Sequence, residues 1–437
     1  MKYEEWLGNK DLEYKDDVLY FDNMNTIDIA NEYGTPIYVT NEQRLRVQYR
    51  KIKNMLDMEY KNNSVHFAVK SNSNLSIIKI LNSEGAEFDC SSTGEVYACF
   101  KAGVKPSQII YTGNMFTDKD FEFAVENDVL VNLDSISQLK RLSKAYKDLE
   151  KEKGVLSFRI NPEFGAGHHS HTITAGKQLK FGILDTQVIE AYSKAKDLGF
   201  DRFGIHQHIG SGILNPWDFE KAAEKYLSIV KELTNKLNIK LEFVDFGGGL
   251  GIPYRPDEDP LDLSIYRDVI IKKFKELVQN EDIGEPKLII EPGRYITAES
   301  TIILTQINTI KNNTYKMFAG VNAGFNTLIR PTMYGSYHHI ISCKINTNDK
   351  KLTYDITGPI CESGDVLGKE RTLPELREGD ILAVLDAGAY GFTMSSVYNS
   401  RPRPAEILIN NGKSYVMRKA EQYDHLMDLQ LIPDHLK

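Results

Sequence analysis

The chain has 437 residues, which is too long for one hydrophobic core of ordinary size, so two domains are expected. Hydrophobic residues make up 41% of the sequence and charged residues 26%, a composition typical of soluble globular proteins. The formal net charge of −8 argues against a nucleic-acid-binding protein.

The N-terminus and the cysteines favour a cytoplasmic protein. The first residues, MKYEEWLGNKDLEYKDD, are polar and acidic, unlike a signal peptide, and no apolar run is long enough to span a membrane. The four cysteines, at positions 90, 99, 343 and 361, include no C-x-x-C pair, which argues against a zinc ribbon or a thioredoxin-like motif. Cysteines this sparse fit a reducing compartment better than secretion.

From residue 36 to 293, short apolar runs alternate with stretches of helical periodicity, such as residues 217–237. The strand-like runs are PIYVT (36–40), SVHFAVK (64–70), AEFDCSS (86–92), IIYTG (109–113), VLVNLD (129–134), VLSFRIN (155–161), FGIHQHIG (203–210), LEFVDFGG (241–248) and KLIIEPG (287–293). Alternation of strand and helix over this length predicts an α/β fold with a parallel sheet.

The number of these runs favours a closed barrel. If PIYVT belongs elsewhere, eight runs remain, which is the strand number of a TIM (β/α)8 barrel. A doubly wound open sheet is the alternative, but it needs a glycine-rich turn after an early strand, and the sequence has none there. We assign residues 36–295 to the barrel.

A different pattern begins after Arg294. Residues 296–437 contain β-rich segments broken by turns, such as STIILTQINTIKN and GDILAVLD, and the alternation with helices is lost. We predict a separate all-β domain there, built as a sandwich or a small barrel. The N-terminal residues 1–35 are expected to join this C-terminal domain.

Polar residues end several of the predicted barrel strands, which is where barrel enzymes carry their catalytic groups. Lys70 ends SVHFAVK and is a candidate amine for covalent attachment of a carbonyl cofactor, although a lysine at the rim can also reach solvent. His208 could stack on an aromatic ring or be a buried core histidine. Glu291 could hold a protonated pyridine nitrogen or form a salt bridge with Arg294.

Glycines follow three neighbouring strands near the end of the predicted barrel. They lie in HIGSG (208–212), DFGGGLG (245–251) and EPGR (291–294). Glycine turns let backbone N–H groups approach an anion, and phosphate commonly binds after the late strands of a barrel. Together the three turns predict a phosphate site.

The cluster GHHSH, residues 167–171, raises the question of a metal site. Its histidines lie in a glycine-rich loop, GAGHHSHTITAGK, without helical i, i+4 spacing and with no fourth ligand in view. We therefore predict no metal and expect this segment to be a loop over the site.

A series of further motifs lies along residues 36–408. With the glycine turns they are FAVKSN (67–72), GAEFDCSSTGE (85–95), HIGSG (208–212), DFGGGLG (245–251), EPGR (291–294), NAGFNTLIRPTMYGSYH (322–338), GPICESGD (358–365) and DAGAYGFTMSSVYNSRPRPAE (386–406). In number and order they resemble the fold type III pyridoxal-phosphate decarboxylases, and among these the diaminopimelate decarboxylases.

The resemblance implies pyridoxal 5′-phosphate as the cofactor and a role for each matched residue. Lys70 would carry the cofactor, Asp89 would support the lysine region, His208 would stack on the ring, and Glu291 would pair with the pyridine nitrogen. The residues implied in phosphate binding are Ser211, Gly247, Gly248, Gly249, Gly293, Arg294 and Tyr390. The residues implied in substrate binding are Arg294, Arg330, Tyr334, Glu362 and Tyr390.

The resemblance also implies a homodimer whose active sites are shared across the interface. Cys361 and Glu362 would reach into the partner subunit's site, with Cys361 as the acid that protonates the carbanion and Glu362 as the partner of the substrate amine. Arg330 suits bidentate capture of a carboxylate that is retained. A retained carboxylate and a retained amine describe meso-diaminopimelate, which would lose its D-centre carboxylate to give L-lysine in lysine biosynthesis.

The chain departs from the family pattern at residues 161–182, NPEFGAGHHSHTITAGKQLKFG, which are expected near the substrate. One alternative is therefore a decarboxylase of another basic or D-configured amino acid, such as D-lysine or D-ornithine. A pyridoxal-phosphate-dependent amino-acid racemase is the alternative of another class. Cys361 in place of a catalytic tyrosine argues against the racemase.

Overall fold

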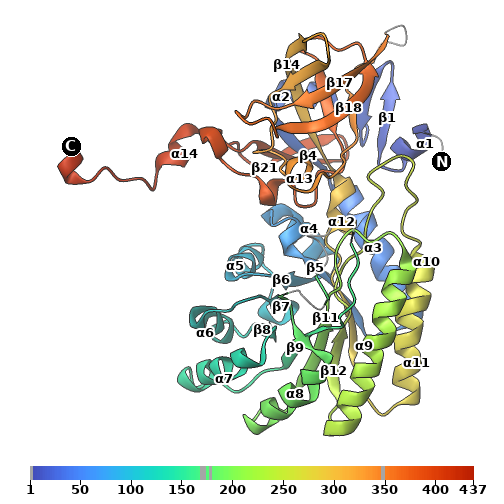
Figure 1. Ribbon diagram of the computed structural model, residues 1–437, viewed down its shortest axis with the longest axis vertical. Helices are drawn as coiled ribbons and strands as arrows, with labels where there is room; N and C mark the ends of the chain where they lie inside the picture. Colours follow the sequence, from blue (N-terminus) through green and yellow to red (C-terminus); the bar gives the residue numbers. More distant parts are fainter. Residues whose placement is uncertain (1–2, 168–173, 177–179, 346–349) are drawn as a thin grey trace. The chain divides into compact units, whose positions relative to one another are not determined.

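The computed structural model describes residues 3–167, 174–176, 180–345 and 350–437 (Figure 1). The chain divides into two compact units. The barrel unit comprises Leu45–Pro253 and Asp259–Ile296, and the β unit comprises Met1–Arg44, Tyr254–Glu258 and Thr297–Lys437. Each unit therefore takes up more than one stretch of the chain.

The barrel unit is built on a closed ring of parallel strands, which confirms the predicted TIM barrel. In the described part, the ring consists of β5 (Asn63–Ala68), β6 (Glu87–Cys90), β7 (Ile109–Thr112), β8 (Leu130–Leu133), β9 (Leu156–Asn161), β11 (Phe203–Gln207), β12 (Leu241–Asp245) and β13 (Lys287–Ile290). Pairing of β8 with β9 and of β13 with β5 closes the ring. The short strand β10 (Ile183–Leu184) pairs with β9 outside it.

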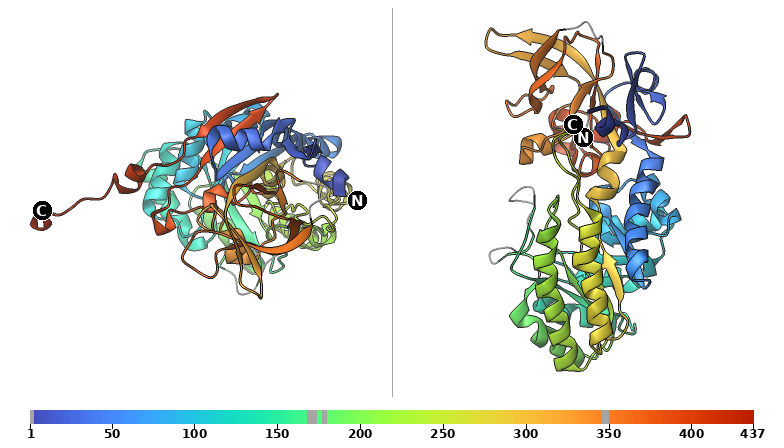
Figure 2. Two further views of the ribbon diagram at one scale, coloured as in Figure 1. Left: turned by 90° about the horizontal axis from the view of Figure 1, so that it is seen from above. Right: turned by 90° about the vertical axis from the view of Figure 1, so that its right-hand side faces the viewer.

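Helices follow the strands and cover the outside of the barrel (Figures 1 and 2). They are α3 (Glu42–Glu59), α4 (Leu75–Ser83), α5 (Thr93–Lys101), α6 (Asp118–Glu126), α7 (Leu139–Asp148), α8 (Val188–Asp197), α9 (Pro216–Leu237), α10 (Leu263–Tyr266) and α11 (Lys273–Asn280), with a π-helical turn, Arg267–Lys272, between the last two. No helix within the described ranges is long and apolar enough to cross a membrane.

Helix α9 shows how the sequence builds this outer layer. Asn215 caps the helix by accepting a hydrogen bond from the Trp217 N–H, and Pro216 fits the first position, where no N–H is needed. Its buried residues include Phe219, Ala222, Ala223, Tyr226, Val230 and Leu233, which recur at three- and four-residue spacing. One face of the helix therefore packs on the barrel, while α11 lies alongside it (Figure 2).

The β unit contains two sheets and a few short helices. A small antiparallel sheet has the order β1 (Leu12–Lys15), β2 (Val18–Phe21) and β3 (Met24–Asn25). The larger sheet has the order β18 (Val366–Pro374), β17 (Lys351–Thr357), β15 (Met317–Val321), β14 (Thr301–Asn312), β4 (Ile37–Asn41), β20 (Ala405–Asn410) and β21 (Lys413–Arg418), and β19 (Ile381–Val384) joins β14 to β16 (Ile340–Ser342). The short helices of this unit are α1 (Tyr3–Gly8), α2 (Thr26–Tyr33), α13 (Arg330–Tyr334) and α14 (Tyr423–Met427). Helix α12 (Arg294–Thr297) lies at the boundary, because the barrel unit ends at Ile296 and the β unit resumes at Thr297.

Strand β4 corrects one boundary of the predicted barrel. The range 36–295 included PIYVT, but β4 pairs with β14 and β20 in the β unit. All five residues of β4 are buried, since Ile37 and Val39 pack in one hydrophobic cluster and Tyr38 packs in another. A strand buried on both faces reads as a continuous apolar run in either kind of sheet, so its sequence did not indicate which sheet it joins.

A buried ion cluster ties the N-terminal segment of the β unit to its C-terminal part. Lys10 Nζ lies 2.9 Å from Glu299 Oε1 and 2.8 Å from Asp386 Oδ1, and Arg44 Nη2 lies 2.7 Å from Glu299 Oε2. Lys10 is only 2% exposed. Burial raises the pKa of Asp386 to about 6 even though the charge of Lys10 acts in the opposite direction. The two carboxylates therefore depend on Lys10 as their shared counter-charge.

We predict that Lys10→Met destabilises the β unit by about 3–5 kcal/mol, because removing one partner of a buried ion cluster leaves charge uncompensated. Urea-induced unfolding of Lys10→Met and of the parent protein measures the effect. Lys15→Met is the matched control, because Lys15 pairs with Glu13 at the surface, where the side chains are 41% and 51% exposed, and such a pair contributes at most about 1 kcal/mol. Equal unfolding midpoints for both variants would contradict the role of Lys10.

Candidate active site

Strand β5 delivers a lysine to the carboxyl end of the barrel. The strand ends at Ala68, and Lys70 lies just beyond it in the 3-10 turn Val69–Ser71. Lys70 Nζ donates a hydrogen bond to Asp89 Oδ2 at 2.5 Å. The Asp89 side chain is fully buried, whereas the Lys70 side chain is 34% exposed. The amine is therefore held by a buried carboxyl group and is still accessible to a small molecule.

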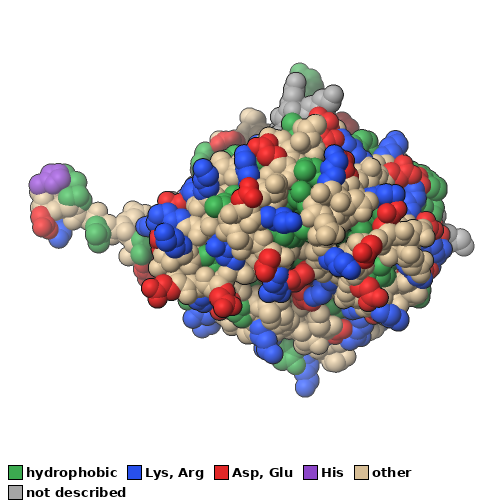
Figure 3. Space-filling model, turned by 90° about the horizontal axis from the view of Figure 1, so that it is seen from below, with side chains coloured by type: hydrophobic (Ala, Val, Ile, Leu, Met, Phe, Trp, Pro, Cys, Tyr) green, Lys and Arg blue, Asp and Glu red, His purple; other side chains and the backbone are tan. Residues whose placement is uncertain are grey.

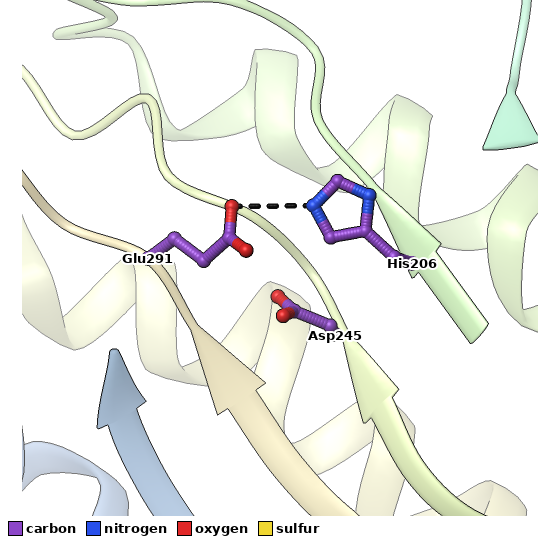
Figure 4. A group of neighbouring side chains, drawn as sticks. All are labelled: His206, Asp245 and Glu291. Atoms are coloured by element: carbon purple, nitrogen blue, oxygen red, sulfur yellow. Dashed lines mark hydrogen bonds and ion pairs between the residues drawn. The ribbon is translucent and has the colours of Figure 1, made fainter. Parts of the chain in front are cut away.

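Three more buried polar side chains come from adjacent strands at this end of the barrel (Figure 4). His206 lies on β11, Asp245 ends β12 and Glu291 follows β13, and their polar atoms lie within 4.8 Å of one another. His206 Nε2 lies 3.2 Å from Glu291 Oε2. Glu291 Oε1 is buried and has no hydrogen-bond partner among the described residues. One oxygen of Glu291 can therefore still accept a hydrogen bond.

The surrounding charges make Glu291 the most readily ionised acid of this group. Burial by itself would raise the pKa of Glu291, but the neighbouring His206 and Lys70 hold that pKa below its ordinary value. Burial and the charge of Glu291 raise the pKa of Asp89, although Lys70 opposes the shift. Burial and Glu291 likewise raise the pKa of Asp245, well above its ordinary value.

The His208 ring, which follows β11, is held in its neutral form. Burial and the positive charges of Arg159 and Lys70 lower the pKa of His208 well below its ordinary value. The backbone N–H of Gly248 donates to His208 Nδ1 at 3.0 Å. Since Nδ1 is the acceptor, the single proton of the neutral ring is on Nε2.

The glycine turn after β12 brings the backbone very close to its neighbours. A Cβ at Gly247 would lie 2.3 Å from the backbone oxygen of Gln207, and a Cβ at Gly248 would lie 2.2 Å from the backbone oxygen of Glu291. Gly247 and Gly249 also have φ angles of +68° and +109°, which side chains disfavour. Close packing therefore requires glycine here and leaves the backbone of the turn uncovered by side chains of its own.

A cation and a hydroxyl group lie at the end of the neighbouring strands. Arg294, at the start of α12, is 4% exposed, and its Nη2 donates to Ser211 Oγ at 3.1 Å. Gly293 precedes it, where a Cβ would lie 2.9 Å from Ser71 Cβ. The three turns that the sequence assigned to phosphate thus follow β11, β12 and β13, which are adjacent in the barrel. Guanidinium, hydroxyl and open turn backbone together have the chemistry of an anion site.

The remaining site residues of the sequence analysis lie in the β unit. They are Arg330, Tyr334, Cys361, Glu362 and Tyr390. Arg330 is 1% exposed and begins α13, which Tyr334 ends. Its Nη1 lies 2.7 Å from His338 Nε2, and its guanidinium carbon lies 4.9 Å from the centre of the Tyr254 ring. The guanidinium is therefore fixed from two sides.

The GPICESGD turn presents a thiol and a carboxylate at the surface of the β unit. Cys361 is exposed, and the Tyr398 hydroxyl donates to Glu362 Oε1 at 2.6 Å. The side chain of Asp365 holds this turn in place, because its two oxygens accept the N–H groups of Ile360 at 2.7 Å and Phe325 at 2.6 Å.

The segment 161–182, in which the chain departs from the family pattern, contacts the residues that follow β11. Thr174 Oγ1 donates to the backbone oxygen of His208 at 3.2 Å, and the Ala166 N–H donates to the backbone oxygen of Ile209 at 3.1 Å. The described parts of the segment around Ala166 and Thr174 therefore contact the backbone of His208 and Ile209. Its histidines, for which a loop over the site and no metal were predicted, lie outside the described residues; they are His168, His169 and His171.

A cavity of about 390 Å³ opens at the opposite end of the barrel, where the strands begin. Figure 3 shows this end of the molecule, with lysine and arginine side chains interspersed among acidic ones. Five of the ionisable residues that line the cavity pair with one another. Glu87 lies 3.0 Å from both Lys287 and His66, and Arg202 lies 2.5 Å from Glu242. Because these charges are balanced locally, we place the functional site at the carboxyl ends of the strands.

Sequence reasoning missed three buried ionisable residues, although each left a signal. His206 stands two residues before His208, and alternate residues of a strand face the same side. Arg159 lies within β9 at 6% exposure, and burial lowers its pKa to about 10. Asp245 is the first residue of DFGGGLG, a motif that was interpreted only through its glycines. The shared signal was a charged or titratable residue inside an apolar strand, which is rarely buried without a function or a partner.

Comparisons with known proteins cover both units. Residues 42–298 match the family described as "Pyridoxal-dependent decarboxylase, pyridoxal binding domain". A diaminopimelate decarboxylase from Methanothermobacter thermautotrophicus is 46% identical over 412 residues, which are 94% of this chain and 95% of that protein. The solved structure of diaminopimelate decarboxylase from M. jannaschii in complex with L-lysine is 32% identical, with a TM-score of 0.92 and coverage of 98% of this chain and 100% of the other.

A more distant solved structure shares the fold alone. The arginine decarboxylase of Paramecium bursaria Chlorella virus is 22% identical, with a TM-score of 0.73, and the match covers 86% of this chain and 96% of the viral one. Proteins named for a different substrate therefore have the same architecture, so the fold by itself does not indicate the substrate.

We predict that Gly248→Ala destabilises the barrel unit by about 1–3 kcal/mol or more. The new Cβ would overlap the backbone oxygen of Glu291, and rotation of a side chain cannot relieve an overlap with the backbone. Urea-induced unfolding measures the loss. Gly94→Ala is the matched control in the same unit, since its Cβ would meet only Ser92 Oγ, at 3.7 Å, and alanine favours the helix α5 that contains it. A Gly248 variant as stable as the Gly94 variant would refute the tight turn.

Proposed function

The chain belongs to the pyridoxal-dependent decarboxylases and, within them, to the diaminopimelate decarboxylases, and on this premise we propose the reaction and its residues. The protein decarboxylates meso-2,6-diaminopimelate at its D-centre and forms L-lysine and CO2, a step of lysine biosynthesis. The observation that carries the proposal is Lys70, an accessible amine on a buried carboxyl group, in a chain that matches diaminopimelate decarboxylases over both units.

The residues at the carboxyl end of the barrel fit pyridoxal 5′-phosphate. Lys70 supplies the amine for covalent attachment, and Asp89 fixes the position of that amine. Glu291 supplies an ionised carboxylate with a buried oxygen that can accept from a protonated pyridine nitrogen. The groups proposed for the phosphate are Ser211, Gly247, Gly248, Gly249, Gly293, Arg294 and Tyr390. When bound, the cofactor takes up the electrons that the departing CO2 leaves behind.

His208 is proposed to stack on the cofactor ring, and its neutral form suits this role. A charged imidazolium against the ring would compete with the protonated pyridine nitrogen for the negative charge of Glu291. The hydrogen bond from Gly248 fixes the plane of the imidazole as well as its tautomer. His208 therefore orients the ring without adding a positive charge beside it.

The proposed substrate has two amino-acid ends, of which only one loses its carboxylate. Arg330 supplies a fork of donors for the retained carboxylate, and its contact with His338 holds that fork in place before the substrate binds. Glu362 suits the retained ammonium group. Tyr334, Arg294 and Tyr390 complete the proposed set of substrate contacts.

We further propose a cytoplasmic homodimer in which Cys361 and Glu362 serve the active site of the partner subunit. Cys361 donates the proton to the carbon that has lost CO2. Its exposure on a turn held by Asp365 supports this role, because a rigid surface turn can present a group to another subunit. The cysteines are not joined in disulfides, which supports a reducing compartment.

The purified holoenzyme should release CO2 from meso-diaminopimelate and form L-lysine. Turnover of D-lysine and D-ornithine should be lower by orders of magnitude, because these substrates lack the distal carboxylate that Arg330 is proposed to bind. CO2 release and chiral chromatography of the products measure both. Decarboxylation of D-lysine or D-ornithine but not of meso-diaminopimelate would refute the substrate, and racemised product without CO2 would identify a racemase.

Two inactive variants should restore activity when they share a dimer. Lys70→Ala should lose the absorption of covalently bound cofactor, and Cys361→Ala should keep that absorption but lose most turnover. If the sites are shared across subunits, co-expression of the two should recover about a quarter of the parent activity, since half of the dimers are mixed and each has one intact site. Co-expression of Lys70→Ala with the Lys70→Ala, Cys361→Ala double variant is the control and should recover none. No recovery in the first mixture would contradict a shared site.

A further inference from the structure

The cluster of His206, Asp245 and Glu291 contains one more acid than the proposed function uses. The three residues are 1%, 0% and 3% exposed. Asp245 Oδ2 and Glu291 Oε1 are both buried, and no donor from the described residues reaches either oxygen. Two ionised carboxylates this close in a dry site repel each other strongly, so one of the two is expected to keep a proton.

The contacts of Asp245 leave one of its oxygens for this purpose. The Gly247 N–H donates to Asp245 Oδ1 at 2.8 Å, and the Tyr226 hydroxyl donates to the backbone oxygen of Asp245 at 2.9 Å. These two hydrogen bonds fix the backbone and the Oδ1 atom of Asp245. Figure 4 shows the carboxyl group of Asp245 pointing toward Glu291. A proton on Asp245 Oδ2 would form a hydrogen bond to Glu291 Oε1, so that both of these oxygens would have a partner.

We propose that Asp245 is a positioning residue for Glu291: as a neutral carboxylic acid it donates a hydrogen bond to the Glu291 carboxylate from β12, while His206 contacts that carboxylate from β11. Each carboxylate oxygen can accept two hydrogen bonds, so the pyridine nitrogen of the cofactor still finds an acceptor on Glu291. The inference rests on the proposed function, because that function makes Glu291 the partner of the ring. It explains how a buried carboxylate stays ionised and correctly oriented there.

The groups that face Asp245 from the packed elements favour its neutral form. Burial and the charge of Glu291 are the main influences that raise its pKa, and Asp89 on β6 adds to them. The groups facing it from the outer helices are the hydroxyls of Tyr226 on α9 and Tyr266 on α10, which are uncharged at neutral pH because burial raises their pKa values. His206 is the neighbour on β11.

The cations of the site act mainly on other acids. Lys70 pairs with Asp89 and lowers the pKa of Glu291, and Arg159 lies near Glu291, Asp89 and Asp134. The cations therefore favour the ionised forms of Asp89 and Glu291, so Asp245 is the acid that is proposed to keep its proton.

The first test needs neither cofactor nor substrate. The infrared spectrum of the cofactor-free protein near neutral pH should contain the C=O stretch of a buried carboxylic acid that is missing in Asp245→Asn. Asp355→Asn is the matched control, because Asp355 is 6% exposed but pairs with Lys316 at 2.7 Å, which lowers the pKa of Asp355. Its difference spectrum should show no acid band. A difference spectrum of Asp245→Asn without an acid band would overturn the proposal, whatever the substrate proves to be.

The second test compares two substitutions in the holoenzyme. Asparagine can accept from Gly247 and donate to Glu291, so Asp245→Asn should keep the parent cofactor affinity and absorption spectrum. Asp245→Ala should weaken cofactor binding about tenfold or more, because a hydrogen bond to a charged group is lost. If Asp245→Asn is as impaired as Asp245→Ala, Asp245 acts as an anion and the proposal is wrong. If Asp245→Ala does not fold, the infrared comparison of the parent with Asp245→Asn decides.

Discussion

The carboxyl end of the barrel gathers more buried acid than it can hold in ionised form. Asp89, Asp245 and Glu291 come from three strands, and each is almost completely excluded from water. An isolated charge in such a place is very unfavourable, so each acid needs a cation, a donor or a proton. Lys70 donates a hydrogen bond to Asp89, and His206 contacts Glu291. Asp245 is proposed to keep its proton. This distribution leaves one negative charge where the ring nitrogen of the cofactor would need it.

Closure of the barrel makes this arrangement possible. Lys70 follows the first strand of the ring and Glu291 follows the last, yet β13 pairs directly with β5. Parallel strands place their carboxyl ends at one edge, so residues from opposite ends of the barrel sequence share one site. The glycines after β12 are also required at this end of the barrel, because the backbone there passes too close to Gln207 and Glu291 for any side chain.

Strand number, strand ends and glycine turns could be predicted from the sequence because they are local features. The place of β4 could not, since a buried strand looks the same in a barrel and in a two-sided sheet. Nor could the partners of Lys10, whose contacts with Glu299 and Asp386 join residues far apart in the chain. Within the site, motifs pointed to Lys70 and Glu291, but not to the buried Asp245 and His206. The polar atoms of these two residues lie within 4.8 Å of those of Glu291 because the fold places β11, β12 and β13 side by side.

The separation into two units bears on how far motifs can identify a substrate. The residues proposed for the cofactor lie almost entirely in the barrel unit, whereas most of those proposed for the substrate lie in the β unit. Barrel motifs therefore indicate cofactor chemistry that many decarboxylases share, and a viral arginine decarboxylase has the same fold. The case for diaminopimelate depends instead on the match to diaminopimelate decarboxylases over both units and on the proposed roles of Arg330 and Glu362 in the β unit. Arg330 is a buried guanidinium held by His338, so its proposed role in substrate binding favours a substrate with a second carboxylate.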